Sequence, residues 1–200
     1  MNVSQAIEER RAVKHYDADH QMPEEDLKKL MEMGMRSPTS FNIQNWRFVH
    51  VSDKQKREEI KEAAWGQAQV TEASTLLIIC AEIKAWDKDP ERYWKNAPQE
   101  VQDILVPMIR PFYEGREWLQ RDEAMRSVGI AAQTLMLGAK EMGYDSCPMI
   151  GFDQDAVAKA INMPDDHVIG MMLVIGKAKE PAKPRGGSID YSEAVIENSF

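Results

Sequence analysis

A chain of 200 residues, 43% of them hydrophobic and 29% charged, is long enough for one compact domain and too apolar to stay disordered. Its formal net charge of -8 disfavours binding to nucleic-acid phosphates and to anionic membranes, so any phosphate that it binds needs a local cluster of cations. No stretch approaches the roughly 18 apolar residues of a membrane span, and the first residues lack the apolar core of a signal peptide.

The first half of the chain predicts helices that alternate with strands. Pro23 and the two acids after it indicate a helix start, because Pro tolerates the first helical position and acids favour the positive helix end. The expected elements are a helix from Ser4 to about Arg10, a helix from Pro23 that stops before Ser37, a loop over 38–42, a strand over 48–51, a helix from Asp53 to about Ala64, and a buried strand over 75–81.

The second half of the chain predicts one long helix and one clear strand. Residues 85–118 show no clear period and are expected to form short helices and loops. The small and apolar residues of 122–142 cover most of a helix circumference, which indicates a helix that is buried on several sides. A helix from Asp153 to about Asn162, a strand from His167 to Gly176 and an extended tail from Lys177 complete an α/β or α+β domain with four or five strands.

Four short segments contain residues that can bind a ligand, although each also has a purely structural explanation. Residues 10–14 place three cations in five positions, and 183–185 add two more. Residues 37–46 combine hydroxyls, amides and one large aromatic, which suits a polar heterocycle or a polyol but also a capped turn. Residues 148–151 end in a glycine, which permits close backbone approach to a ligand or a simple turn.

The usual catalytic motifs are absent from the sequence. The four histidines are scattered, outside any GxSxG or HExxH context, and the chain contains neither GxGxxG nor GxxxxGK[ST]. Two cysteines, Cys80 and Cys147, form no CxxC pair and no metal-ligand spacing, which fits a reducing cytosol. We therefore expect a cytoplasmic protein without a metal, in which a cofactor performs any chemistry.

In their order and spacing, these segments resemble the flavin-dependent (FMN) nitroreductase family. The resemblance covers nearly the whole chain, from the run Arg10-Arg11-Ala12-Val13-Lys14 through 37–46, 72–74 and 148–152 to 183–185. It implies an α+β, three-layer fold in which helices flank a mixed sheet, in one domain over 1–200 whose tail from about 177 packs on a partner chain. It also implies an interlocked homodimer with two FMN sites at the interface, and a ping-pong cycle driven by NADH or NADPH.

The resemblance also implies roles for individual residues, with the flavin rather than a catalytic side chain performing the chemistry. Lys14 would lie near the flavin N1 edge, where a cation stabilises the negative charge of the reduced form. The cofactor-binding residues implied are Arg10, Arg11, Lys183 and Arg185 at the phosphate; Ala12 and Lys14; Pro38, Thr39, Ser40 and Asn42 from the partner chain; Gln69 or alternatively Gln67; and Pro148, Met149, Ile150 and Gly151 against the ring system.

Two positions depart from the pattern of the classical bacterial members. The classical members have Glu where this chain has Ile150, and Lys where this chain has Gln69. The pocket is therefore expected to be more apolar than in the classical members, and their preference for NADH or NADPH does not carry over to this chain. Trp94, Phe112 and Tyr113 either stack a flat acceptor or pack a dimer interface. The expected activity is reduction of nitroaromatics, quinones or similar flat electrophiles. The alternatives are dehalogenation, flavin breakdown or azoline oxidation on the same fold, or a flavin-binding redox sensor.

Overall fold

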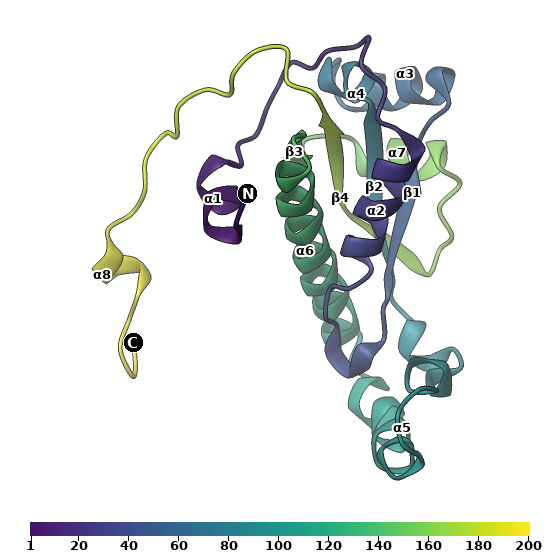
Figure 1. Ribbon diagram of the computed structural model, residues 1–200. Coiled ribbons are helices and arrows are strands. Elements are labelled where there is room, and N and C mark those ends of the chain that lie inside the picture. Colours follow the sequence, from purple (N-terminus) through teal and green to yellow (C-terminus); the bar gives the residue numbers. More distant parts are fainter.

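The structure, a computed structural model that describes all 200 residues, is built around a four-stranded sheet (Figure 1). The strands are β1 (Trp46–His50), β2 (Thr75–Glu82), β3 (Asp145–Met149) and β4 (His167–Gly176), in the order β1-β2-β4-β3. All three ladders are antiparallel, and the only parallel pairing is the isolated bridge between Ala12 and Ser146. The sheet of the single chain is therefore antiparallel and not mixed as expected, because each helical connection returns the chain antiparallel to its neighbouring strand.

Helices cover both faces of the sheet, as the three-layer expectation required. One face carries α2 (Glu24–Gly34) and the long helix α6 (Glu117–Glu141), and the other carries α3 (Lys54–Ala63), α4 (Gln69–Glu72) and α7 (Gln154–Ala160). Strand β2 is buried along its whole length because its alternate side chains enter both cores. Leu77 and Ile79 join the α6 core, whereas Leu76 and Ile78 join the α3–α7 core.

Three expected elements differ in the structure, and one of them is the loop over 38–42, which contains the 3-10 turn η1 (Ser40–Asn42). The first helix, α1 (Val3–Glu9), is capped by Asn2 and Gln5 in a reciprocal capping box, so Ser4 is not its cap. Residues 85–118 contain the short turns η2 (Ala85–Asp87) and η3 (Pro90–Tyr93), as expected, but also the 15-residue helix α5 (Gln99–Tyr113). Two internal prolines concealed this helix in the sequence, because proline normally interrupts helical hydrogen bonding.

The C-terminal tail leaves the body of the domain. After β4 the chain runs in an extended path to the short helix α8 (Tyr191–Ala194) and ends apart from the sheet (Figure 1). Its large apolar side chains are exposed, including Ile189, Tyr191 and Phe200. The extended tail was predicted. No helix in the structure combines the length and apolar character that crossing a membrane requires.

An ionic network ties the sheet to the turns that follow β2. The buried carboxylate of Glu82 pairs with Arg47 on β1 and with Lys88 after η2. Lys88 also contacts Asp166 at 2.6 Å, and the His167 ring nitrogen lies 2.7 Å from the same carboxylate. Hydrogen bonds from Lys88 and His167 lower the pKa of Asp166 from 3.8 to about 2.

Replacing Asp166 by Asn is expected to flatten the acid limb of the stability profile. A carboxylate whose folded pKa is lowered contributes stability that is present above its unfolded pKa and is lost as the pH falls from about 4 to about 2. Denaturant unfolding between pH 5 and pH 2.5 should therefore show a smaller loss of stability for the variant than for the wild type. Asp165→Asn, at an exposed neighbour without an ion pair, is the control. Parallel profiles for Asp166→Asn and the wild type would contradict the assignment.

Candidate functional site

Residues 10–15 and the first part of the C-terminal tail, residues 180–187, line a groove of about 680 Å³. Five cations line it, and the single carboxylate in its lining is that of Glu180. The groove brings together the predicted residues Arg10, Arg11, Ala12, Lys14, Lys183 and Arg185. In a chain of net charge -8, such a concentration of cations favours a phosphate-bearing ligand.

Hydrogen bonds fix some of these cations and leave others free. The Arg11 guanidinium donates to the Lys183 carbonyl at 2.5 Å, which fastens the tail to the N-terminal segment. Arg185 donates to the carbonyls of Ile7, Glu8 and Arg10 at 3.2–3.4 Å, where α1 ends and unpaired carbonyls accept a cation favourably. The guanidinium of Arg10 has no protein partner and is available to a ligand.

Lys14 is held at the edge of β3. The backbone N–H of Val13 donates to the Ser146 carbonyl at 3.2 Å, and the parallel bridge from Ala12 to Ser146 extends this contact. The Lys14 ammonium donates to the Cys147 sulfur at 3.3 Å. Lys14 therefore lies beside β3, which leads into residues 150 and 151.

Gly151 lies in a small cluster of polar and aromatic side chains. Its carbonyl accepts a hydrogen bond from Gln67 at 2.8 Å, and the buried Gln69 donates to the Gln67 amide oxygen at 3.0 Å. Ile150 is 75% exposed, so it presents an apolar surface to whatever ligand lies on this segment. The structure brings these predicted residues together, and Met149 beneath them is buried.

Trp65 is a further residue of this cluster that was not predicted from the sequence. Its indole lies 3.2 Å from the position that a Cβ on Gly151 would occupy, and its side chain is 70% exposed. Its backbone has a φ of +58°, which an aromatic residue rarely adopts. A tryptophan directly before a glycine at a helix end was the signal that could have found it, since an exposed aromatic held in such a turn favours ligand contact.

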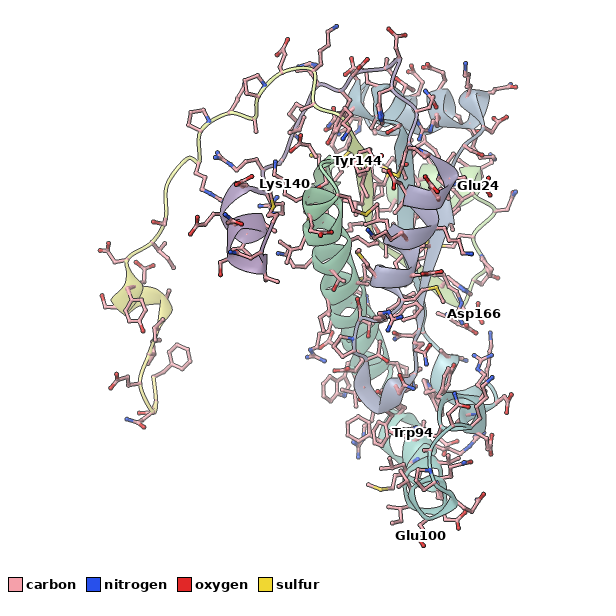
Figure 2. All side chains as sticks on the ribbon, in the orientation of Figure 1. Glu24, Trp94, Glu100, Lys140, Tyr144 and Asp166 are labelled. Carbon is pink, nitrogen blue, oxygen red and sulfur yellow. The ribbon has the colours of Figure 1, made fainter.

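The segment Pro38–Asn42 lies far from this groove within one chain. It follows α2 and reaches the end of α6 opposite to the basic groove, where Trp94 donates to the Phe41 carbonyl at 3.1 Å (Figure 1). Figure 2 shows Trp94 below one end of α6 and Lys140 at the other end, a helix of 25 residues or about 37 Å. A single chain therefore does not bring Pro38, Thr39, Ser40 and Asn42 to the cations.

The aromatic residues of 85–118 divide into buried and exposed members. Tyr113 is 2% exposed and packs on Trp86, so it belongs to the core and does not stack a substrate. Phe112 is 38% exposed and lies 5.3 Å from the Phe41 ring, and Trp94 is half-buried. Only Phe112 and Trp94 remain available for a ligand or for a partner chain.

Comparison with known proteins identifies the family. Residues 7–177 match the model of the Nitroreductase family, and the chain belongs to it. Protein DrgA of Synechocystis sp. is 53% identical over 190 residues, which cover 94% of this chain and 90% of that protein. MhqN of Bacillus subtilis, provisionally named as an NAD(P)H nitroreductase, is 36% identical over 94% of this chain and 95% of its own length.

A solved structure from the same family carries the cofactor that the resemblance implied. A nitroreductase-type protein from Exiguobacterium sibiricum, crystallised with FMN, superimposes with a TM-score of 0.91 at 28% identity. The alignment covers 98% of this chain and 97% of the other. This match confirms the nitroreductase fold that the sequence predicted.

Proposed function

We propose that this protein is an FMN-dependent NAD(P)H oxidoreductase. The observation that carries the proposal is the groove of five cations between residues 10–15 and 180–187, in which Lys14 lies beside β3. Arg10, Arg11, Lys183 and Arg185 would bind the FMN phosphate, and Gly151 with Gln67 would border the ring system. The FMN-bound relative supports this assignment. Bound FMN would supply the redox chemistry by accepting two electrons from a reduced nicotinamide and passing them to an acceptor.

The proposed site needs two chains. Pro38, Thr39, Ser40 and Asn42 lie at the far end of α6, so they can reach a flavin in the basic groove only from a partner chain. The tail beyond Lys177 exposes Ile189, Tyr191 and Phe200, which favours packing on a second copy of the chain. The proposed working unit is therefore a homodimer with two equivalent sites.

The residues around Gly151 support a proposal for the acceptor class. Ile150 and Trp65 are exposed and apolar, and the atoms nearest to a Cβ built on Gly151 belong to Trp65 and Gln67. Such a surface favours flat, apolar electrophiles over anions, because aromatic and aliphatic walls stack a planar ring. The proposed acceptors are nitroaromatics and quinones, which would use the site in turn with the nicotinamide donor.

A stopped-flow panel tests the activity. FMN-loaded protein is reduced anaerobically with NADPH or NADH, and then mixed with a quinone, a nitroarene or free flavin. Reoxidation of the flavin by quinones or nitroarenes is the expected result of the mixing. Steady-state rates with the same acceptors should give parallel lines in double-reciprocal plots. Reduction of the protein without reoxidation by any of these acceptors would contradict the proposed acceptor class and favour different chemistry on the same fold.

Replacing Arg10 by Ala is expected to weaken FMN binding by about 1.5–3 kcal/mol, on the order of ten- to a hundredfold in Kd. The reason is that Arg10 has no protein partner and is free to make a charge-assisted bond to the phosphate. Fluorescence titration of apoprotein with FMN measures the change. Arg121→Ala removes an exposed cation without an ion pair on α6 and should leave the Kd unchanged. Equal affinities of Arg10→Ala and the wild type would place the phosphate elsewhere.

A further inference from the structure

A second cationic groove lies at the opposite end of the molecule from the first. It has a volume of about 520 Å³, and its wall contains three cations and no carboxylate. Its lining residues are Asn42, Gln44, Trp46, Arg47, Arg92, Tyr93, Lys95 and Asn96. A purely cationic lining is unusual in a chain with 33 acidic and 25 basic residues, so this groove attracts anions against the overall charge.

Two of the three cations form no ion pair. Arg47 pairs with the buried Glu82 and donates to the carbonyls of Gln44 and Trp46, so its charge is compensated. The Arg92 guanidinium lies 4.7 Å from the centre of the Tyr93 ring and donates to the Tyr93 hydroxyl at 2.6 Å, a neutral partner. Lys95 is exposed and forms no ion pair. Arg92 and Lys95 therefore keep their charge available for an anionic ligand.

The segment that carries these cations is fastened to residues 38–42. The Asn42 amide donates to the Tyr93 carbonyl at 2.8 Å, and the Trp94 indole donates to the Phe41 carbonyl at 3.1 Å. Phe41 and Asn42 both have positive φ, so these bonds hold a backbone that would otherwise relax. Wherever residues 38–42 lie in a dimer, Arg92 and Lys95 accompany them.

We infer that this groove binds the phosphate groups of the nicotinamide dinucleotide donor. The inference rests on the proposed function, in which residues 38–42 border the flavin of the partner chain. The first groove would be filled by the FMN phosphate, so a donor whose nicotinamide meets the flavin must place its own phosphates elsewhere. Arg92 and Lys95 are the free cations that adjoin that border, and an arginine fork suits phosphate oxygens.

The test is a steady-state comparison of charge-neutral variants. The double variant Arg92→Gln/Lys95→Gln is compared with Lys28→Gln/Lys29→Gln, which removes two exposed cations from α2 and matches the change in net charge. The groove variant should raise the KM for the donor about tenfold, while kcat, the KM for a quinone and the FMN affinity stay unchanged. A rise in KM for NADPH alone identifies the 2′-phosphate as the group bound in the groove, and a rise in KM for both NADPH and NADH identifies the pyrophosphate.

A binding measurement separates this inference from the proposed function. Titration of the FMN-loaded variants with oxidised NADP+ should show the same loss of affinity in the absence of turnover. The inference would be overturned if the Arg92/Lys95 variant had the same donor KM and the same NADP+ affinity as the Lys28/Lys29 control. The proposed function would stand in that case, because the wild type would still turn over. A wild type that takes up no FMN, or whose flavin NAD(P)H does not reduce, would instead contradict the proposed function.

Discussion

Replacing Lys14 by Met is expected to lower the reduction potential of bound FMN by about 30–60 mV and to slow its reduction by NAD(P)H. The Lys14 ammonium is held 3.3 Å from the Cys147 sulfur, beside the segment that we propose borders the flavin. At an effective dielectric constant of about 20, a unit charge about 6–12 Å away contributes roughly 1.4–2.8 kcal/mol. For a two-electron couple, about 30 mV corresponds to 1.4 kcal/mol.

The control for this prediction separates charge from shape. Met keeps the length of the Lys14 side chain and removes its charge, whereas Lys14→Arg keeps the charge. Spectroelectrochemical titration should therefore give a lowered potential for Lys14→Met and a potential near that of the wild type for Lys14→Arg. The FMN affinity should change much less than it does in Arg10→Ala, because Lys14 is not assigned to the phosphate. A wild-type potential in Lys14→Met would refute its placement near the flavin.

Replacing Gly170 by Ala is expected to lower the free energy of unfolding by about 3 kcal/mol, the upper part of the usual range for overpacking. Gly170 lies where the β2–β4 register shifts between Ile79 and Cys80, and α6 approaches the sheet at this point. A Cβ on Gly170 would lie 2.4 Å from Cγ1 and 2.9 Å from Cβ of Val128. Val128 is β-branched and fully packed, so it cannot rotate away and the helix itself must shift.

A double-mutant cycle in denaturant unfolding checks this contact. Val128→Ala alone removes two methyl groups from the core and is itself destabilising. Combined with Gly170→Ala, it removes the 2.4 Å contact with Cγ1 and leaves the 2.9 Å contact with Cβ, so the double variant should be more stable than the sum of the two single effects predicts. Additive effects of the two substitutions would show that the close approach of α6 to Gly170 does not limit packing there.

The elements with a clear pattern were predictable from sequence. The helices that begin at Asp53 and Asp153 were predicted, and in the structure each aspartate accepts a hydrogen bond from the backbone N–H three residues on. The long buried helix and the strand from His167 to Gly176 were found from composition and apolar runs. Helix α5 was missed because prolines interrupt its pattern, and the antiparallel order of the strands depends on long-range pairing that no local pattern encodes.

The candidate site was predictable in part. The two basic runs stand about 170 residues apart, and only the fold shows that Arg11 and Lys183 touch. The second cationic groove could not be predicted because Arg47 on β1 lies 45 residues before Arg92 in the sequence, and only the fold brings it to the segment of Arg92 and Lys95. The contact between Trp65 and Gly151 likewise joins two turns that local patterns treat independently.

An anaerobic titration of the reconstituted protein tests the central claim most directly. Apoprotein is loaded with FMN, freed of excess cofactor, and titrated with NADPH and separately with NADH while the flavin absorbance at about 450 nm is followed. The account predicts a yellow protein with one FMN per chain whose absorbance is bleached by one equivalent of at least one donor. A protein that stays colourless with excess FMN, or whose bound flavin neither donor bleaches, would contradict it.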